Sequence, residues 1–188
     1  MEAPLWILFL WGSIGSLDSL YNHLYRYRLY AHASSFTEHI SHTVLTLGMV
    51  LTVTMLVLVE MGSVGFAFFL GVQAFLLIGT FWDVSIEFRS RASLGGFPRH
   101  EYFLHTAIFL LHGAFVWAVV ANMDQLVHGP GLGTFRWPPL PAFLRFQALA
   151  FLIISLGVLF LHVYLMGVGY RALNKISSTS LATELSRP

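Results

Sequence analysis

The chain has 188 residues, of which 56% are hydrophobic and 10% are charged, and its mean hydropathy is +0.72. Soluble globular domains carry about 25% charged residues, so this composition excludes a soluble globular protein and also a disordered one. The absence of cysteine excludes disulfides, thiolate metal sites and cysteine nucleophiles. A net charge of +1 gives no reason to expect nucleic acid binding. We therefore expect an integral membrane protein whose surroundings are the lipid bilayer.

Five apolar segments are long enough to cross a bilayer, which takes about 20 residues of helix. They lie near residues 4–24, 40–60, 64–88, 102–122 and 143–170. We expect the first to be a retained helix rather than a signal peptide, because Glu2 precedes it and no small-residue cleavage site follows it. The link between the second and third segments is Met61, Gly62 and Ser63, which predicts a tight antiparallel pair of helices.

These segments predict an all-α integral membrane fold with one transmembrane domain, residues 1–176, and a flexible cytoplasmic tail, residues 177–188. The connection over residues 123–142 is rich in glycine and proline, so we expect an ordered or interfacial loop there. Eight of the ten lysines and arginines follow the first, third or fifth segment. The positive-inside rule then places the N-terminus outside and the C-terminus in the cytoplasm, and we expect a bacterial inner membrane.

Two stretches of the chain follow the same plan, the first beginning at Gly15 and the second at Gly79. Each has an Asp near the end of a helix, a His or Glu about one turn later, an Arg-x-Arg, a short polar loop and a Glu-x-x-x-His-Thr that opens the next helix. The plan predicts two similar helical hairpins, over about 4–60 and 64–122, which form a four-helix bundle with the fifth helix appended. Both hairpins would turn in the cytoplasm, so the repeat is parallel, with its axis along the membrane normal.

The repeat concentrates acids and histidines at one depth of the membrane. Residues four apart share a helix face, which places Glu38 with His42. Asp18 and His23 are five apart and reach one centre with some distortion of the helix. The expected metal ligands are Asp18, His23, Glu38, His42, Asp83, Glu87, Glu101 and His105. His39 or His100 is an alternative to a neighbour in this set. His112 and His162 are either additional ligands, a proton relay, a pair of haem ligands, or polar residues hydrogen-bonded within the bundle.

Carboxylates in a low-dielectric bundle cost several kcal/mol each unless they are protonated, paired with arginine or bound to cations. One alternative is therefore a belt of salt bridges between these acids and the arginines of the same side. This alternative leaves unexplained why Glu38 and Glu101 each have a histidine one turn deeper. Mixed carboxylate and imidazole ligands from four helices favour a site for two metal ions.

The ligand pattern resembles that of the di-iron carboxylate four-helix bundles, in which two helices each give a carboxylate and two give a Glu-x-x-His pair. The chain differs in its Glu-x-x-x-His spacing and in having His23 at one carboxylate position. It lacks the histidine-rich boxes of the membrane fatty acid desaturases. The resemblance implies two transition-metal ions, with iron first and with zinc or manganese as alternatives.

The function that we expect from this pattern is a membrane-embedded oxidoreductase with a non-haem di-iron centre. Its substrate would be lipid-like or otherwise hydrophobic, and an electron-donor protein would be a partner; the catalytic residues stay unassigned. We expect the arginines of the same side to bind an anionic headgroup, namely Arg26, Arg28, Arg89, Arg91 and Arg99.

Two other classes of function stay open. One is a zinc-dependent membrane hydrolase with the same ligands. The other is a membrane electron carrier with haem between helices, held by histidines from the set His42, His105, His112 and His162. Transport ranks below both, because the outer halves of spans two to five are apolar apart from Gln73 and Gln147.

Overall fold

A computed structural model describes the backbone of residues 2–96, 98–136 and 140–185, with side chains up to Lys175. Within this part of the chain, five helical segments are long and apolar enough to cross a membrane. They are Glu2–Ala31, Phe36–Leu58, Ser63–Ser90, Arg99–Ala121 and Ala142–Lys175. The chain is therefore mostly helical, and the prediction of five helices able to span a bilayer is confirmed.

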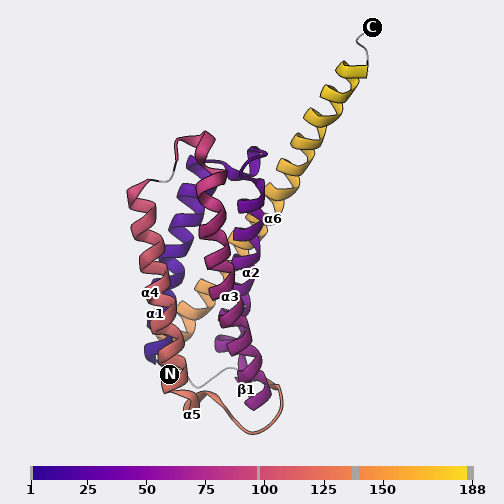
Figure 1. Ribbon diagram of the computed structural model, residues 1–188. Helices are drawn as coiled ribbons and strands as arrows, with labels where there is room; N and C mark the ends of the chain where they lie inside the picture. The colour runs from indigo at the N-terminus through magenta and orange to yellow at the C-terminus, as the bar shows by residue number, and fades with distance from the viewer. Residues whose placement is uncertain (1, 97, 137–139, 186–188) are drawn as a thin grey trace.

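The elements follow one another along the chain with short connections. In chain order they are α1 (Glu2–Leu17), the π-helix η1 (Asp18–Arg26), the 3-10 helix η2 (Leu29–Ala31), α2 (Phe36–Leu58), β1 (Val59–Met61), α3 (Ser63–Ser90), the 3-10 helix η3 (Ala92–Leu94), α4 (Arg99–Ala121), α5 (Met123–Leu126), β2 (Gly133–Phe135) and α6 (Ala142–Leu185). Figure 1 shows the two termini at opposite ends of the bundle, with α6 extending well beyond it.

The helices pack as two closely associated groups. α1 lies against α4, while α2 lies against both α3 and α6 (Figure 1). α3 and α4, which the sequence places in one hairpin, approach each other less closely than α2 and α3 do. The tight pair formed by α2 and α3 follows from their short connection, which consists of β1 and Gly62.

The core is apolar in the half of the bundle nearest the N-terminus. Leu5 and Leu8 of α1, Phe69 of α3 and Phe115 of α4 have no exposed surface. Large apolar side chains also cover the outside of the helices, and Phe160 is 75% exposed. A soluble protein rarely exposes so much contiguous apolar surface, whereas a bilayer solvates it. The polar residues gather in the opposite half, at the end that carries η2 and η3.

A π-helical segment continues α1 at the point where the polar half begins. Its wider turn, with hydrogen bonds between residues five apart, places Asp18 and His23 close to one another along the helix. The Asn22 side chain donates to Asp18 Oδ1 over 2.6 Å and so fixes that carboxylate. The five-residue spacing of Asp18 and His23 required a distorted helix if both were to reach one centre, and the π-helix η1 is that distortion.

Two regions outside the first four spans can be compared with the sequence-based expectations. The connection over 123–142 is ordered where it is described, because β2 pairs with β1 in an antiparallel register that sets Phe135 opposite Val59; residues 137–139 lie outside the described residues. α6 continues through residues 177–185, which we expected to form a flexible tail. That stretch holds no glycine or proline to end the helix. Residues 186–188 lie outside the described part.

Candidate metal centre

All eight residues predicted as ligands lie in one cluster at the end of the bundle that carries η2 and η3. They come from η1, α2, α3 and α4. Seven of them are buried, and the His42 side chain is 12% exposed. The spacing along each helix and the packing of the four segments together produce this cluster, which we call the carboxylate–histidine cluster.

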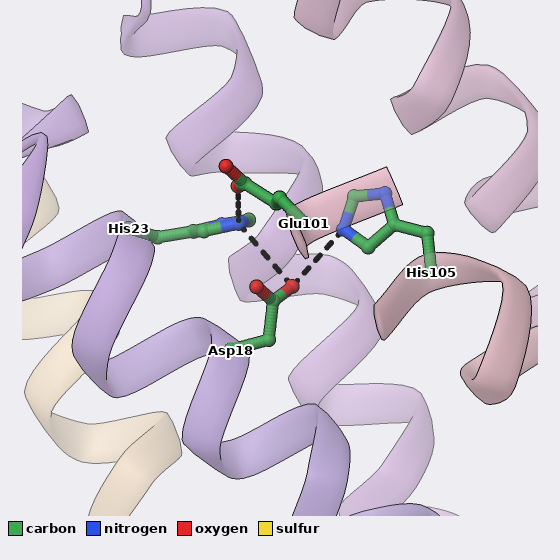
Figure 2. Close-up of side chains that lie close together, drawn as sticks. All are labelled: Asp18, His23, Glu101 and His105. Atoms are coloured by element: carbon green, nitrogen blue, oxygen red, sulfur yellow. Dashed lines mark hydrogen bonds and ion pairs between the residues drawn. The ribbon is translucent and has the colours of Figure 1, made fainter. Parts of the chain in front are cut away.

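One half of the cluster joins η1 to α4. Asp18, His23, Glu101 and His105 each offer a ligand atom, and these atoms lie within 4.8 Å of one another. Asp18 Oδ2 is 3.0 Å from His105 Nε2 and 3.4 Å from His23 Nε2 (Figure 2). His23 Nε2 is also 3.4 Å from Glu101 Oε1. Figure 2 shows these four side chains pointing toward a common centre from two different segments.

The other half of the cluster joins α2 to α3. The ligand atoms of His23, Glu38, His42 and Glu87 also lie within 4.8 Å of one another. Asp83 belongs to this half through His42, because Asp83 Oδ2 is 2.9 Å from His42 Nε2. The rings of His23 and His42 meet edge to face, with centroids 3.7 Å apart. His23 therefore lies between the halves and belongs to both.

The two halves contain the same kind of pair between a carboxylate and an imidazole. Asp18 of η1 pairs with His105 of α4 at 3.0 Å, and Asp83 of α3 pairs with His42 of α2 at 2.9 Å. Asp18 and Asp83 hold matching places in the plan of the two sequence stretches, as do His42 and His105. Each pair thus links a residue from one stretch to a residue from the other.

Arg91 enters the middle of the cluster from the end of α3. Its Nη2 lies 2.5 Å from Glu38 Oε1, its Nη1 donates to Glu101, and its Nη2 lies 3.7 Å from Glu87 Oε1. The ring of Tyr27 covers the guanidinium at 4.6 Å. Burial works to lower the pKa of Arg91, but its bonds to Glu38 and the nearby carboxylates outweigh burial and raise that pKa, so the side chain stays charged.

Arg91 corrects one expectation from the sequence. We grouped it with the arginines that would bind a headgroup, but it has no exposed surface, so it cannot meet a headgroup from the bilayer. Buried carboxylates require a positive partner, and the buried guanidinium of Arg91 supplies one. The other four members of that group, Arg26, Arg28, Arg89 and Arg99, are exposed at the same end of the bundle.

His39 and His100 lie outside the cluster. His100 is exposed, and its Nε2 is 3.2 Å from Arg26 Nη1. His39 is fully buried, but its Nε2 donates to the carbonyl oxygen of His162 over 3.1 Å. The two rings of His39 and His162 stack with centroids 5.1 Å apart, and His162 Nε2 is 2.6 Å from Ser19 Oγ. These contacts tie α6 to α2 and η1 beside the cluster.

His112 lies deeper in the bundle and makes a different set of contacts. Its ring stacks on Trp11 with centroids 4.3 Å apart, and its Nε2 is 3.2 Å from Gln73 Oε1. Gln73 in turn donates to Thr52 over 2.8 Å. These contacts form a chain of buried polar side chains within the apolar half. Of the roles expected for His112, this is the one of a polar residue hydrogen-bonded within the bundle.

Three residues of the site were missed by the sequence reasoning. Asn22 bonds to Asp18, and its position four residues after Asp18 on one helix face was a readable signal. Ser90 donates to Glu38 from the end of α3, and Ser19 bonds to His162. Serines at helix ends are common, so nothing in the sequence distinguished these two from the others.

The carboxylates of the cluster outnumber its arginine, so its charges balance within the protein only if the imidazoles beside them are protonated. Five carboxylates are buried there, those of Asp18, Glu38, Asp83, Glu87 and Glu101. Among the arginines that the structure describes, Arg91 alone is buried. Glu101 Oε2 and His23 Nδ1 are buried and make no hydrogen bond with the described residues. An oxygen-rich set with imidazoles, in which some buried ligand atoms make no hydrogen bond, fits transition-metal cations.

A cavity of about 120 Å³ adjoins the cluster on the side of the bundle centre. Asp18, His42, Asp83 and His105 contribute to its wall, and most of the other lining residues are apolar. The cluster thus adjoins a mostly apolar, partly open cavity. No protein-family model, curated protein or solved structure matches the chain.

Proposed function

We propose that the carboxylate–histidine cluster is a dinuclear transition-metal centre, and that the chain is a membrane-embedded oxidoreductase with non-haem iron as its metal. The convergence of five buried carboxylates and three imidazoles in two groups of ligand atoms carries this proposal. With the imidazoles neutral, five carboxylates face one buried guanidinium, and burying an uncompensated carboxylate costs several kcal/mol. Two divalent cations would offset that excess, and three imidazoles are in place to complete their coordination.

The two halves of the cluster divide the ligands between the ions. Asp18, Glu101 and His105 would hold one ion, while Glu38, His42 and Glu87 would hold the other. His23 lies within reach of both groups, and Asp83 orients His42 from behind. Bound iron in such a site supplies the capacity to activate oxygen.

Arg91 has a positioning role in this proposal. It bonds to Glu38 and Glu101, one carboxylate from each half. The planar guanidinium presents several donors in a fixed geometry, so it orients both carboxylates while leaving their other oxygens available. Its charge also lowers the cost of gathering five acids in one place.

The parallel repeat belongs to the same proposal. Matching residues of the two stretches form ion pairs of nearly equal length, at 2.9 Å and 3.0 Å. The packing of α1 on α4 parallels that of α2 on α3. These similarities support two hairpins of one plan, each of which supplies ligands to both ions. Of the pair Arg28 and Arg91, which match in the plan, Arg91 alone enters the cluster, so the repeat is not exact in this respect.

The surroundings of the cluster support a hydrophobic substrate. The cavity brings apolar space up to Asp18 and His105. Arg26, Arg89 and Arg99 are exposed at the same end, where they suit an anionic headgroup on the cytoplasmic side. We propose, from the positive-inside rule, that the N-terminus lies outside the membrane. The haem alternative is weaker, because His162 and His112 already contact Ser19 and Gln73.

Oxygen uptake tests the proposed function. We expect the protein, loaded anaerobically with Fe(II) in lipid nanodiscs, to take up oxygen in proportion to its bound iron when air is admitted. Protein loaded with Zn(II) should take up none, because zinc has no redox chemistry. The variant Glu60→Gln, altered at the opposite end of the bundle, is the matched control. Oxygen uptake no faster than that of free Fe(II) in empty nanodiscs, together with release of hydrolysed lipid by the zinc-loaded protein, would favour the hydrolase and contradict the oxidoreductase.

A further inference from the structure

The cavity beside the cluster is partly open to the outside of the bundle and is bounded by residues of α1, η1, α2, α3, α4 and α6. Asp18 and His105 form part of its polar end. Trp11, Met49 and Leu76 line it farther from the cluster. Trp11 precedes Asp18 by seven residues, which corresponds to ~10 Å along a helix. The cavity therefore extends along the bundle axis, from the ion ligands into the apolar half.

The size and walls of the cavity suit a hydrocarbon group. An apolar cavity of about 150 Å³ stays dry and accepts benzene, and this one measures about 120 Å³. Two of its hydroxyls are already used within their own helices, because Thr46 donates to His42 O over 2.7 Å and Thr80 donates to Leu76 O over 2.8 Å. The wall beyond the polar end has hydroxyls but no charged side chain, so a charged group there would lose its hydration without gaining an ionic partner. Because the cavity extends along the bundle axis, its cross-section is narrow, and a narrow cavity suits an alkyl chain better than an aromatic ring.

Gly15 keeps this space open. No atom lies within 4 Å of the position that a Cβ would take at Gly15, and Gly15 lines the cavity. Gly79 holds the matching place in the second stretch, and there a Cβ would lie 2.8 Å from Leu45 Cδ2. Gly79 thus allows close packing of α3 on α2, whereas Gly15, at the matching position of the first stretch, leaves a cavity.

We propose that this cavity binds the end of an unbranched alkyl chain, and that the carbons nearest the polar end lie beside Asp18 and His105. The inference deepens the proposed function and rests on it for the reaction at those carbons, whereas binding of the chain itself requires no metal. The substrate class that follows is a lipid with a saturated tail, whose hydrocarbon chain passes beside the cluster into the cavity.

Trp11 supplies a direct readout, because it lines the cavity and is 4% exposed. A variant with Trp11 as its single tryptophan removes the other four indoles, and it carries phenylalanine in place of Trp6, Trp82, Trp117 and Trp137. With 1-bromohexane as a contact quencher, we expect saturable quenching of Trp11 in detergent micelles. Gly15→Leu should fill the cavity and raise the half-quenching concentration more than ~10-fold. Gly15→Val, with a smaller side chain, should raise it less and covers the case in which leucine prevents folding.

Gly113→Leu is the matched control, because Gly113 is exposed on α4 and also has no atom within 4 Å of a Cβ. In this variant, the half-quenching concentration of Trp11 should equal that of the parent. Quenching that rises linearly without saturation, equally in the parent, Gly15→Val and Gly113→Leu, would overturn the inference. The metal content of the same samples separates the two proposals. Saturable quenching without bound metal would contradict the proposed function alone, and bound metal without saturable quenching would contradict the alkyl-chain site alone.

Discussion

Replacing both Glu38 and Glu101 with glutamine is expected to weaken metal binding by more than ~100-fold. Loss of a group that only supports a ligand already costs about 10- to 100-fold in metal affinity, and here one carboxylate ligand is lost from each half of the cluster. Glutamine keeps the volume of the side chain, so packing is preserved. The measurement is the number of metal ions per chain, by elemental mass spectrometry of detergent-purified protein after dialysis against a weak chelator.

Two further variants serve as controls for this result. Glu60→Gln removes a carboxylate near Arg136, at the other end of the bundle, and should leave the metal content unchanged. A triple variant with Arg91→Met added to the two glutamines removes the guanidinium that would otherwise lose two of its partners. If both the double and the triple variant are monodisperse and keep the full metal content of the wild type, Glu38 and Glu101 are not ligands.

Arg91→Met is expected to lower the free energy of unfolding of the metal-free protein by about 3–5 kcal/mol. Removing one partner of a buried ion pair leaves the other partner charged and without compensation, and Arg91 has more than one such partner in Glu38 and Glu101. Methionine retains the apolar stem, so little packing is lost. The measurement is unfolding by titration with a denaturing detergent, followed by circular dichroism.

Arg89→Met is the control, because Arg89 is exposed two residues away and should leave the unfolding midpoint unchanged. Metal ions separate the two accounts of the cluster. If cations bind there, adding Mn(II) should restore part of the stability lost in Arg91→Met, since the ions replace the missing positive charge. If the cluster is a salt-bridge network alone, Mn(II) should have no effect. Equal stability of Arg91→Met and the wild type without metal would contradict the structural role of Arg91.

The scarcity of charge made the site readable from the sequence. With nine acids in a chain of 188 residues, a carboxylate within an apolar span requires a reason. Helix geometry then placed Glu38 beside His42 and Glu101 beside His105 before any tertiary contact was known. Because both spacings recur in the two similar sequence stretches, convergence of the eight residues could be predicted. Spans of about 20 apolar residues are similarly local features.

The place of Arg91 could not be read from the sequence. Arg89 and Arg91 are both arginines at the C-terminal end of α3. A helix turns by about 200° between residues two apart, so the two side chains point in different directions. Which of the two faces the carboxylates depends on the rotation of α3 against its neighbours, and only tertiary packing sets that rotation. The same holds for His39, whose partner His162 lies on α6, distant along the chain. A residue that meets its partner across a helix interface leaves no periodic signal.

Salt bridges to arginine are present in the structure, but they pair only some of the buried carboxylates. Arg91 pairs with Glu38 and Glu101, while Asp18 and Asp83 pair with histidines. The remaining arginines at this end are exposed and lie outside the cluster. Cations or protons are therefore needed to hold the acids in place, and the imidazoles beside each acid favour cations.

The content of transition metal in the wild-type protein tests the central claim most directly. The protein would be expressed with iron, zinc and manganese in the medium, purified in detergent without chelator, and analysed for metal and for protein by amino-acid content. The proposed centre predicts a transition metal at about two ions per chain, following the two halves of the cluster, and no loss in the Glu60→Gln protein. A folded, monodisperse protein with no stoichiometric metal, even after incubation with each ion in turn, would contradict it.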